Sequence, residues 1–271
     1  KKARQYGERI RMIWGDITDP ASVKSAVKDQ KAVIHLAASI PPFSEEKPVL
    51  AERINVQGTQ FVVDAISEQA VMPLLVFPSS ISVHGWSANR PAPCQIDTPF
   101  DAKDAYAGHK IACEALLRAS SVPWVILRIG ACVDGFSTDK GGEQKAAMKH
   151  MFSLHPETRI EYLHPKDAAL AMNNALDNPE VIGKTLFLGS GRSSQMSWIE
   201  FINTVPRAMG LGDLPVEAFG DAPYYTDWMN TEESEKLLQF QRHGYDRYLQ
   251  EVHHKWRVPR VLLTPARGLV K

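Results

Sequence analysis

The stretch A-V-I-H-L-A at Ala32 to Ala37 decides the fold class. It is an apolar run whose one polar member is His35, so it lacks the alternation of apolar and polar residues that marks a strand with one solvated face. Such a run suits a strand that is covered on both faces, which is typical of a parallel sheet. The chain on either side should therefore alternate strands with the helices that cover them.

The neighbouring segments keep this alternation. We expect strands at Ile10 to Trp14, Ala32 to Ala37, Leu74 to Phe77, Trp124 to Ile129 and Thr185 to Leu188. We expect helices at Pro20 to Val27, Val49 to Ala70, around Tyr106, at Gln144 to Phe152, at Ala168 to Leu176 and at Trp198 to Met209. The first of these helices has Asp19 as its N-cap. The βαβ order predicts a doubly wound α/β fold, whose ligands bind at the carboxyl ends of the strands.

Composition excludes several classes of protein. The 271 residues carry 31 Lys+Arg and 31 Asp+Glu, and this balance argues against nucleic-acid binding, which favours a basic excess. No apolar stretch approaches the ~20 residues of a membrane span. Cys94, Cys113 and Cys132 form no C-x-x-C pair, so we expect a reduced, cytoplasmic setting, with Cys113 and Cys132 in the core.

Tyr106 and Lys110 are the first candidate functional residues. They lie four residues apart in D-A-Y-A-G-H-K-I-A-C-E-A-L-L, a segment whose Ala, Ile, Glu and Leu content favours a helix. That spacing puts both side chains on one helix face, where the ammonium should lower the phenol's pKa and make it a general acid/base. The same spacing also occurs on many solvated helices.

Seven short motifs in order resemble the extended short-chain dehydrogenase/reductases, often called the NAD-dependent epimerase/dehydratase family. They are G-D-I-T-D at 15–19, V-I-H-L-A-A at 33–38, N-V-Q-G-T at 55–59, S-S-I-S-V-H-G at 79–85, Y-x-x-x-K at 106–110, L-R-I-G-A-C-V-D-G at 127–135 and H-P-K-D-A-A at 164–169. Each motif is weak alone, but the series spans more than half of the chain.

The resemblance implies a role for each matching residue. Tyr106 would be the catalytic acid/base, Lys110 would lower its pKa and hold the nicotinamide ribose, and Ser80 would donate a hydrogen bond to the substrate oxygen. The cofactor-binding residues would be Asp16, Ile17, Leu36, Ala37, Ala38, Asn55, Tyr106, Lys110 and Gly130, with no metal ligand. Asp16 could instead be only a turn residue. His84 and Asp134 stand where the family commonly has Tyr before Gly.

The resemblance also implies a domain plan. Residues 1–134 would form a partial Rossmann-type dinucleotide-binding domain, to which strand 185–188 could return, and residues 135–271 would form a smaller substrate-binding lobe. The sequence contains no G-x-x-G-x-x-G fingerprint, and its first strand corresponds to the family's third. We therefore expect the natural protein to carry a first βαβ unit of roughly 50 residues before Lys1. Without that unit, the strand at 10–14 would have no neighbour in the sheet.

Two classes of function remain open at this level. The first is an NAD- or NADP-dependent epimerase, dehydratase or reductase that moves a hydride at a carbonyl or secondary alcohol carbon. Its partners would be a small-molecule substrate such as a nucleotide sugar, and a second copy in a homodimer, with neither nucleic acid nor membrane. The second is a non-catalytic member that uses the fold for binding or regulation. The presence of Ser80, Tyr106 and Lys110 together favours the enzyme.

Overall fold

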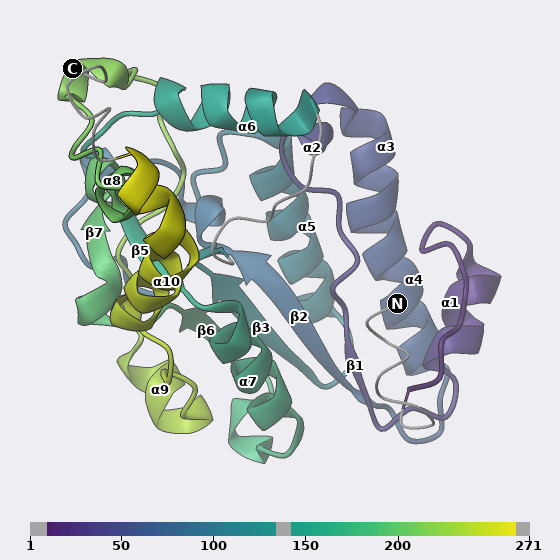
Figure 1. Cartoon of the computed structure of the whole chain (residues 1–271). Coiled ribbons are helices and arrows are strands. Elements are labelled where there is room, and N and C mark those ends of the chain that lie inside the picture. Colours follow the sequence, from purple (N-terminus) through teal and green to yellow (C-terminus); the bar gives the residue numbers. More distant parts are fainter. Residues whose placement is uncertain (1–9, 134–141, 264–271) are drawn as a thin grey trace.

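A parallel four-stranded sheet forms the centre of the computed structural model, which describes residues 10–133 and 142–263. Its strands are β1 (Ala32–Ile34), β2 (Leu74–Ser80), β3 (Trp124–Ile129) and β6 (Thr185–Leu188), in the order β1-β2-β3-β6 (Figure 1). Every neighbouring pair of these strands is parallel. The doubly wound α/β prediction is therefore confirmed, and the segment 185–188 pairs with β3.

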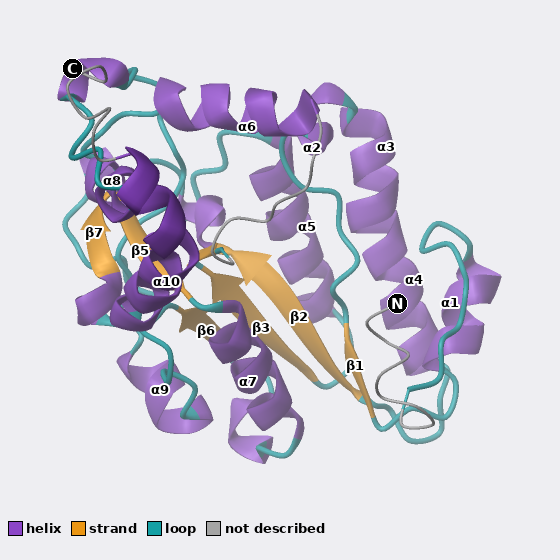
Figure 2. Cartoon of the chain, in the orientation of Figure 1, coloured by secondary structure: helices purple, strands orange, loops and turns teal. Residues whose placement is uncertain are grey.

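Helices cover both faces of this sheet (Figure 2). One layer contains α1 (Pro20–Val27), α4 (Gly58–Ser67) and α5 (Ala105–Ala119), and the other contains α7 (Pro165–Leu176) and α9 (Glu232–Leu238). Successive residues of β2 serve the two layers, because Leu75 and Phe77 pack with the first and Val76 packs with the second. The central strands β2 and β3 thus bury both faces. The prediction of burial on both faces is wrong for β1, because it is an edge strand with no fully buried residue and with Ile34 37% exposed.

A smaller lobe lies beside the carboxyl ends of these strands (Figure 1). Its elements are β4 (Ala131–Cys132), β5 (Arg159–Leu163), β7 (Gln195–Ser197), α6 (Gly142–Ser153), α8 (Trp198–Ala208) and α10 (Tyr245–Leu263). Aromatic rings fill its core, where Tyr162 and Tyr248 have centroids 4.8 Å apart. Within the described ranges, none of the helices has the continuous apolar length that a bilayer crossing requires.

Three predicted elements differ from the structure. The strand predicted at Ala32 to Ala37 ends at Ile34. Residues 10–14 form no strand, and Trp14 is 89% exposed, because β1 is the edge of the sheet and none of the described strands pairs with this segment. The helix predicted at 49–70 is divided into α3 (Pro48–Glu52), a π-helical turn (Arg53–Gln57) and α4, and it follows a short helix, α2 (Phe43–Glu46). The strands of the lobe, α9 and α10 were not predicted.

Candidate active site

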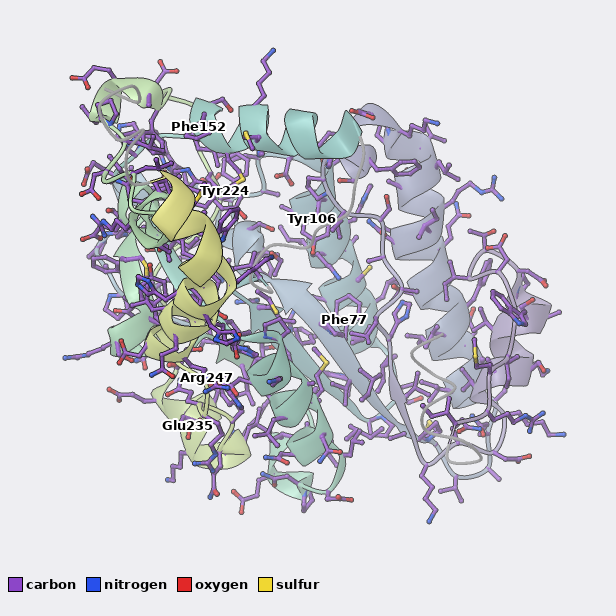
Figure 3. The ribbon with its side chains drawn as sticks, viewed as in Figure 1. Phe77, Tyr106, Phe152, Tyr224, Glu235 and Arg247 are labelled. Carbon is purple, nitrogen blue, oxygen red and sulfur yellow. The ribbon has the colours of Figure 1, made fainter. Side chains whose placement is uncertain are left out.

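Tyr106 and Lys110 come from the first two turns of α5. The helix begins after Asp104, whose carboxylate accepts a hydrogen bond from Ala107 N at 2.7 Å. Lys110 Nζ lies over the ring of Phe77 in β2 and over the ring of Tyr106, and Figure 3 shows Tyr106 between Phe77 and Tyr224 of the lobe. The sequence spacing therefore brings the phenol and the ammonium to the carboxyl edge of the sheet.

Lys110 is buried against β2. Its Nζ donates to the Pro78 carbonyl at 2.6 Å and lies 4.7 Å from the centroid of the Phe77 ring. The Tyr106 ring centroid is 5.6 Å from the same nitrogen. Burial lowers the pKa of Lys110 to about 8, so the ammonium is still the main form at neutral pH.

The pKa of Tyr106 differs from the sequence-based expectation. Burial raises it to about 12, and the interaction with the Ser80 side chain offsets only part of this effect. The Tyr224 phenol and the Asp104 carboxylate raise it further. The predicted lowering by Lys110 is therefore wrong for this ligand-free structure, because the ammonium is held by the Pro78 carbonyl and the phenol is partly desolvated.

Ser80 lies at the end of β2, beside the Tyr106 phenol. Its oxygen accepts hydrogen bonds from Ser82 N at 3.2 Å and from Ser82 Oγ at 2.9 Å, which caps the 3₁₀ turn Ile81–His84. Because these bonds use the acceptor capacity of the oxygen, the hydroxyl hydrogen is left for the Tyr106 phenol, whose pKa this interaction lowers, or for a ligand oxygen in its place.

A buried ion pair lies directly behind these residues. Glu114, one turn after Lys110, accepts from Arg128 Nε at 3.0 Å and Nη2 at 2.8 Å, and from Ser79 Oγ at 2.6 Å. Burial alone would raise the pKa of Glu114, but Arg128, Ser79 and Arg118 together lower it. The pair fastens α5 to β2 and β3 next to the Ser80 and Lys110 positions.

His84 extends this network into the turn after Ser80. Its Nε2 accepts from Arg128 Nη1 at 2.9 Å, so the ring proton lies on Nδ1 and is donated to the Pro99 carbonyl at 3.2 Å. Burial and then the charge of Arg128 lower the pKa of His84 to about 4. This neutral imidazole stands at a position where the family that the motifs resemble commonly has a tyrosine. Its two hydrogen bonds hold the turn and do not involve Tyr106.

Asn55 lies in the π-helical turn, an element often found at functional sites. Its side chain accepts from Ser39 N at 2.6 Å and donates to Ser39 O at 2.9 Å, and it lies 3.3 Å from His109 Nδ1. Asn55 therefore connects the segment after β1 to α5, although its hydrogen bonds do not include Lys110.

The remaining cofactor-side candidates lie along the sheet edge that contains β1. Leu36, Ala37 and Ala38 follow this strand and are exposed, with Leu36 at 66%. Asp16 is exposed and accepts from Thr18 N at 2.8 Å and Thr18 Oγ1 at 2.9 Å, and these hydrogen bonds lower its pKa. Ile17 packs on α4, where a Cβ at Gly58 would lie 2.8 Å from Ile17 Cγ1.

Gly130 has a packing reason of its own. A Cβ at this position would lie 2.6 Å from Met229 Cε and 3.1 Å from the Glu161 carbonyl oxygen. The glycine thus permits the close approach of the lobe to the end of β3. The backbone N–H of Gly191, which follows β6, donates to the buried Glu161 carboxylate at 2.9 Å, so the segment after β6 binds a side chain of the lobe.

Three further expectations can be placed. Cys113 is buried, as predicted, whereas Cys132 at the end of the short strand β4 is exposed, so its assignment to the core is wrong. Asp134 lies outside the described residues. The sequence reasoning missed Glu45 and Glu114, although Glu114 follows Lys110 at the same four-residue spacing that drew attention to the lysine.

Comparisons with known proteins show what the chain is similar to. Residues 1–133 match the model of the NAD dependent epimerase/dehydratase family. D-erythronate dehydrogenase from Cupriavidus necator is 27% identical over 184 residues, which cover 62% of this chain and 56% of that protein. The chain thus spans about half the length of this curated relative.

Solved structures share the fold over almost the whole chain. A short-chain dehydrogenase/reductase superfamily protein from Agrobacterium tumefaciens, solved with bound NAD, has a TM-score of 0.70 and 23% identity, covering 93% of this chain and 87% of that one. A UDP-glucuronic acid 4-epimerase from Bacillus cereus, in complex with UDP-glucuronic acid and NAD, has a TM-score of 0.74 and 17% identity, covering 94% and 85%. Residues 1–133 thus match the NAD dependent epimerase/dehydratase family, and the solved structures show that the similarity of fold continues through the rest of the chain.

Proposed function

We propose that this chain is the catalytic part of an NAD- or NADP-dependent enzyme that moves a hydride at a carbonyl or secondary alcohol carbon. One observation carries the proposal: Tyr106 and Lys110, from the first turns of α5, lie beside Ser80 and Pro78 at the carboxyl end of β2. A phenol beside a hydroxyl donor, with a buried ammonium one helical turn away, can deliver a proton to a ligand oxygen and stabilise charge there.

The residues along the β1 edge fit part of a dinucleotide. Ala37 and Ala38 are exposed residues with small side chains beside the strand end, which allows a flat ligand to approach closely, and the exposed Leu36 offers it an apolar contact. The Ser39 hydroxyl is buried and has no hydrogen-bond partner among the described residues, as expected of a group that waits for a ligand. Asp16 and Ile17 would hold the adenine side, Asn55 would order the network, and Gly130 would border the nicotinamide side. The nicotinamide, when bound, supplies or accepts the hydride.

Tyr106, Ser80 and Lys110 would then have separate tasks. With a pKa of about 12 the phenol is protonated at neutral pH, so in the reducing direction Tyr106 Oη gives its proton to the carbonyl oxygen. Ser80 Oγ–H donates to the same oxygen and stabilises the charge that develops on it. In the oxidising direction Tyr106 must first lose its proton, and Lys110 Nζ would assist by leaving the Pro78 carbonyl for the phenol side.

Two of the similar proteins are named for polar substrates. D-erythronate dehydrogenase and UDP-glucuronic acid 4-epimerase are named for hydroxylated substrates, so we propose a polyhydroxylated acid or a nucleotide sugar for this chain. The lobe beside Tyr106, which contributes Tyr224, would bind its non-reacting part. A binding or regulatory module without catalysis is the competing function.

Tyr106→Phe is the decisive test. Loss of the proton carrier should lower turnover by about 10²- to 10⁴-fold while the cofactor affinity is kept, as measured by cofactor absorbance and by calorimetry. Tyr245→Phe is a matched control, because this phenol hydrogen-bonds Thr204 in the lobe, and it should leave turnover near the parent value. If Tyr106→Phe also keeps turnover within a few-fold of the parent, the phenol is not the acid/base and the binding module becomes the better function.

A further inference from the structure

A carboxylate from a distant segment is bound to the start of the helix that carries Tyr106. Glu45 in α2 accepts from Ala105 N through Oε2 at 3.0 Å and from Tyr106 N through Oε1 at 3.1 Å. These are two of the backbone N–H groups that the first turn of an α-helix leaves without internal partners. The backbone of Tyr106 itself is therefore held by a residue 61 positions away in sequence.

The local structure fixes the orientation of Glu45. The preceding residue, Ser44, is fully buried, and its hydroxyl donates to Glu45 Oε1 at 2.9 Å. The α2 helix also packs directly on α5. The Glu45 side chain is thus aimed at α5 by a buried anchor, although Glu45 itself is an exposed residue.

The helix already has its own cap, so Glu45 has a separate role. Asp104 supplies the ordinary N-cap by accepting from Ala107 N at 2.7 Å. Glu45 adds a second carboxylate, and the pKa of Asp104 is raised first by burial and further by the charge of Glu45. Placing two acids at this helix start brings like charges together, and the favourable helix dipole compensates for this only partly.

The segment that contains Glu45 begins at the candidate cofactor side of the site. Ser39 is pinned by Asn55, and the chain then runs through 40–47 to α3. Glu45 is the part of this segment that reaches the first turn of α5. Glu45 therefore connects the segment 39–47 with Tyr106, the residue that would transfer the proton.

We infer that Glu45 is a positioning residue that couples the segment 39–47 to Tyr106 and sets the place of the phenol relative to the bound substrate. This inference rests on the proposed function for its effect on turnover, and on the hydrogen bonds alone for the coupling. A misplacement of a reacting group by about 1 Å can cost on the order of 10²-fold in rate, so the loss of both hydrogen bonds should be visible in turnover.

The activity experiment compares two neighbouring acids. Glu45→Ala in the full chain should lower kcat by roughly tenfold or more, while the substrate KM changes by less than about threefold. Glu45→Gln keeps one oxygen acceptor and should restore part of kcat. Glu46→Ala is the matched control. Glu46 is exposed on the same helix, and its carboxylate makes no hydrogen bond or ion pair with any described residue. Equal kcat values for Glu45→Ala and Glu46→Ala would overturn the positioning role.

A second measurement does not depend on turnover. In hydrogen–deuterium exchange, Glu45→Ala should speed exchange both in residues 40–47 and in residues 104–107, because the link holds both segments. Asp104→Ala removes only the helix's own cap and should speed exchange in 104–107 alone. If Glu45→Ala leaves residues 40–47 unchanged, the coupling is absent. Failure of the proposed function would appear instead as unaltered turnover in Tyr106→Phe, with the exchange pattern intact.

Discussion

Two glutamates, Glu114 and Glu161, are both fully buried but have different hydrogen-bond partners. Glu114 in the sheet layer meets two guanidinium groups and the Ser79 hydroxyl. Glu161 in the lobe is also fully buried, but its partners are the uncharged donors Met229 N, Gln195 Nε2 and Gly191 N, each within 2.9 Å. Both side chains are fully buried, but the donors to Glu114 include charged groups, whereas Glu161 has uncharged donors and lies near the Asp227 carboxylate.

The two pKa values shift in opposite directions as a result. For Glu161, burial dominates and raises the pKa, because its three hydrogen bonds lower it only in part. For Glu114, burial is outweighed by the hydrogen bonds and charge of Arg128, with help from Ser79 and Arg118, so the pKa is lowered. The comparison shows that hydrogen bonds alone do not keep a buried carboxylate acidic here, whereas a paired cation does.

The largest effect should follow from breaking the charged pair. Glu114→Gln leaves the buried guanidinium of Arg128 without its counter-charge, and removing one member of such a pair costs about 3–5 kcal/mol of unfolding free energy. Urea denaturation with linear extrapolation measures this loss. Adding Arg128→Met to the same chain removes the uncompensated charge and should recover part of the stability. A double variant that is less stable than Glu114→Gln would contradict the uncompensated charge as the cause.

A smaller effect is expected for the acid with neutral partners. Glu161→Gln exchanges one acceptor oxygen for a donor that faces N–H groups, and such a mismatch costs about 1–3 kcal/mol at neutral pH. The dependence of stability on pH has the opposite sign for Glu161 and for Glu114, because the pKa of Glu161 is raised and that of Glu114 is lowered. A folded-state pKa that is raised lowers stability as pH rises from the usual glutamate range through the folded pKa, and this loss is absent below that range.

Urea denaturation across pH can separate the two acids. The deficit of Glu161→Gln relative to the parent should shrink as pH rises, because the parent bears the cost of ionising the buried acid. The deficit of Glu114→Gln should instead grow as pH rises above the lowered pKa, where the parent gains its full ion-pair stability. If the two deficits changed with pH in the same direction, the contrast between the two sites would not hold.

Local features of this structure could be predicted from the sequence. The strand Trp124–Ile129 has the bounds that its apolar run predicts, and so does the strand Thr185–Leu188. The Asp19 cap of α1 is also where the sequence places it. Each of these features depends on residues a few positions apart, so short-range patterns contain the necessary information.

Features that depend on distant partners could not be predicted. The composition of segment 10–14 predicts a strand, but a strand also needs a neighbour, and no described strand pairs with this segment. That the segment would lack a neighbour was expected from the sequence, but the loss of the strand itself was not. Glu45 reaches α5 across 60 positions, and Arg128 meets Glu114 only after β3 has paired with β2. The raised pKa of Tyr106 likewise follows from burial by the lobe and the sheet, which its spacing to Lys110 does not reveal.

The smallest effect on stability is expected from removing one of the two weaker partners of Glu114, Ser79 or Arg118. Ser79→Ala deletes the 2.6 Å hydrogen bond on the side next to Ser80, and Arg118→Gln deletes the 2.8 Å bond on the outer side, where Arg118 is 36% exposed. Each variant should lose only about 1 kcal/mol of stability, because the Arg128 pair stays in place. Since Ser79 is the residue before Ser80, the loss of its bond frees the end of β2, and turnover should fall a few-fold more in Ser79→Ala than in Arg118→Gln. Steady-state kinetics beside thermal denaturation of both variants provides the check. Equal turnover at equal stability would mean that the Glu114 network supports the fold but does not position Ser80.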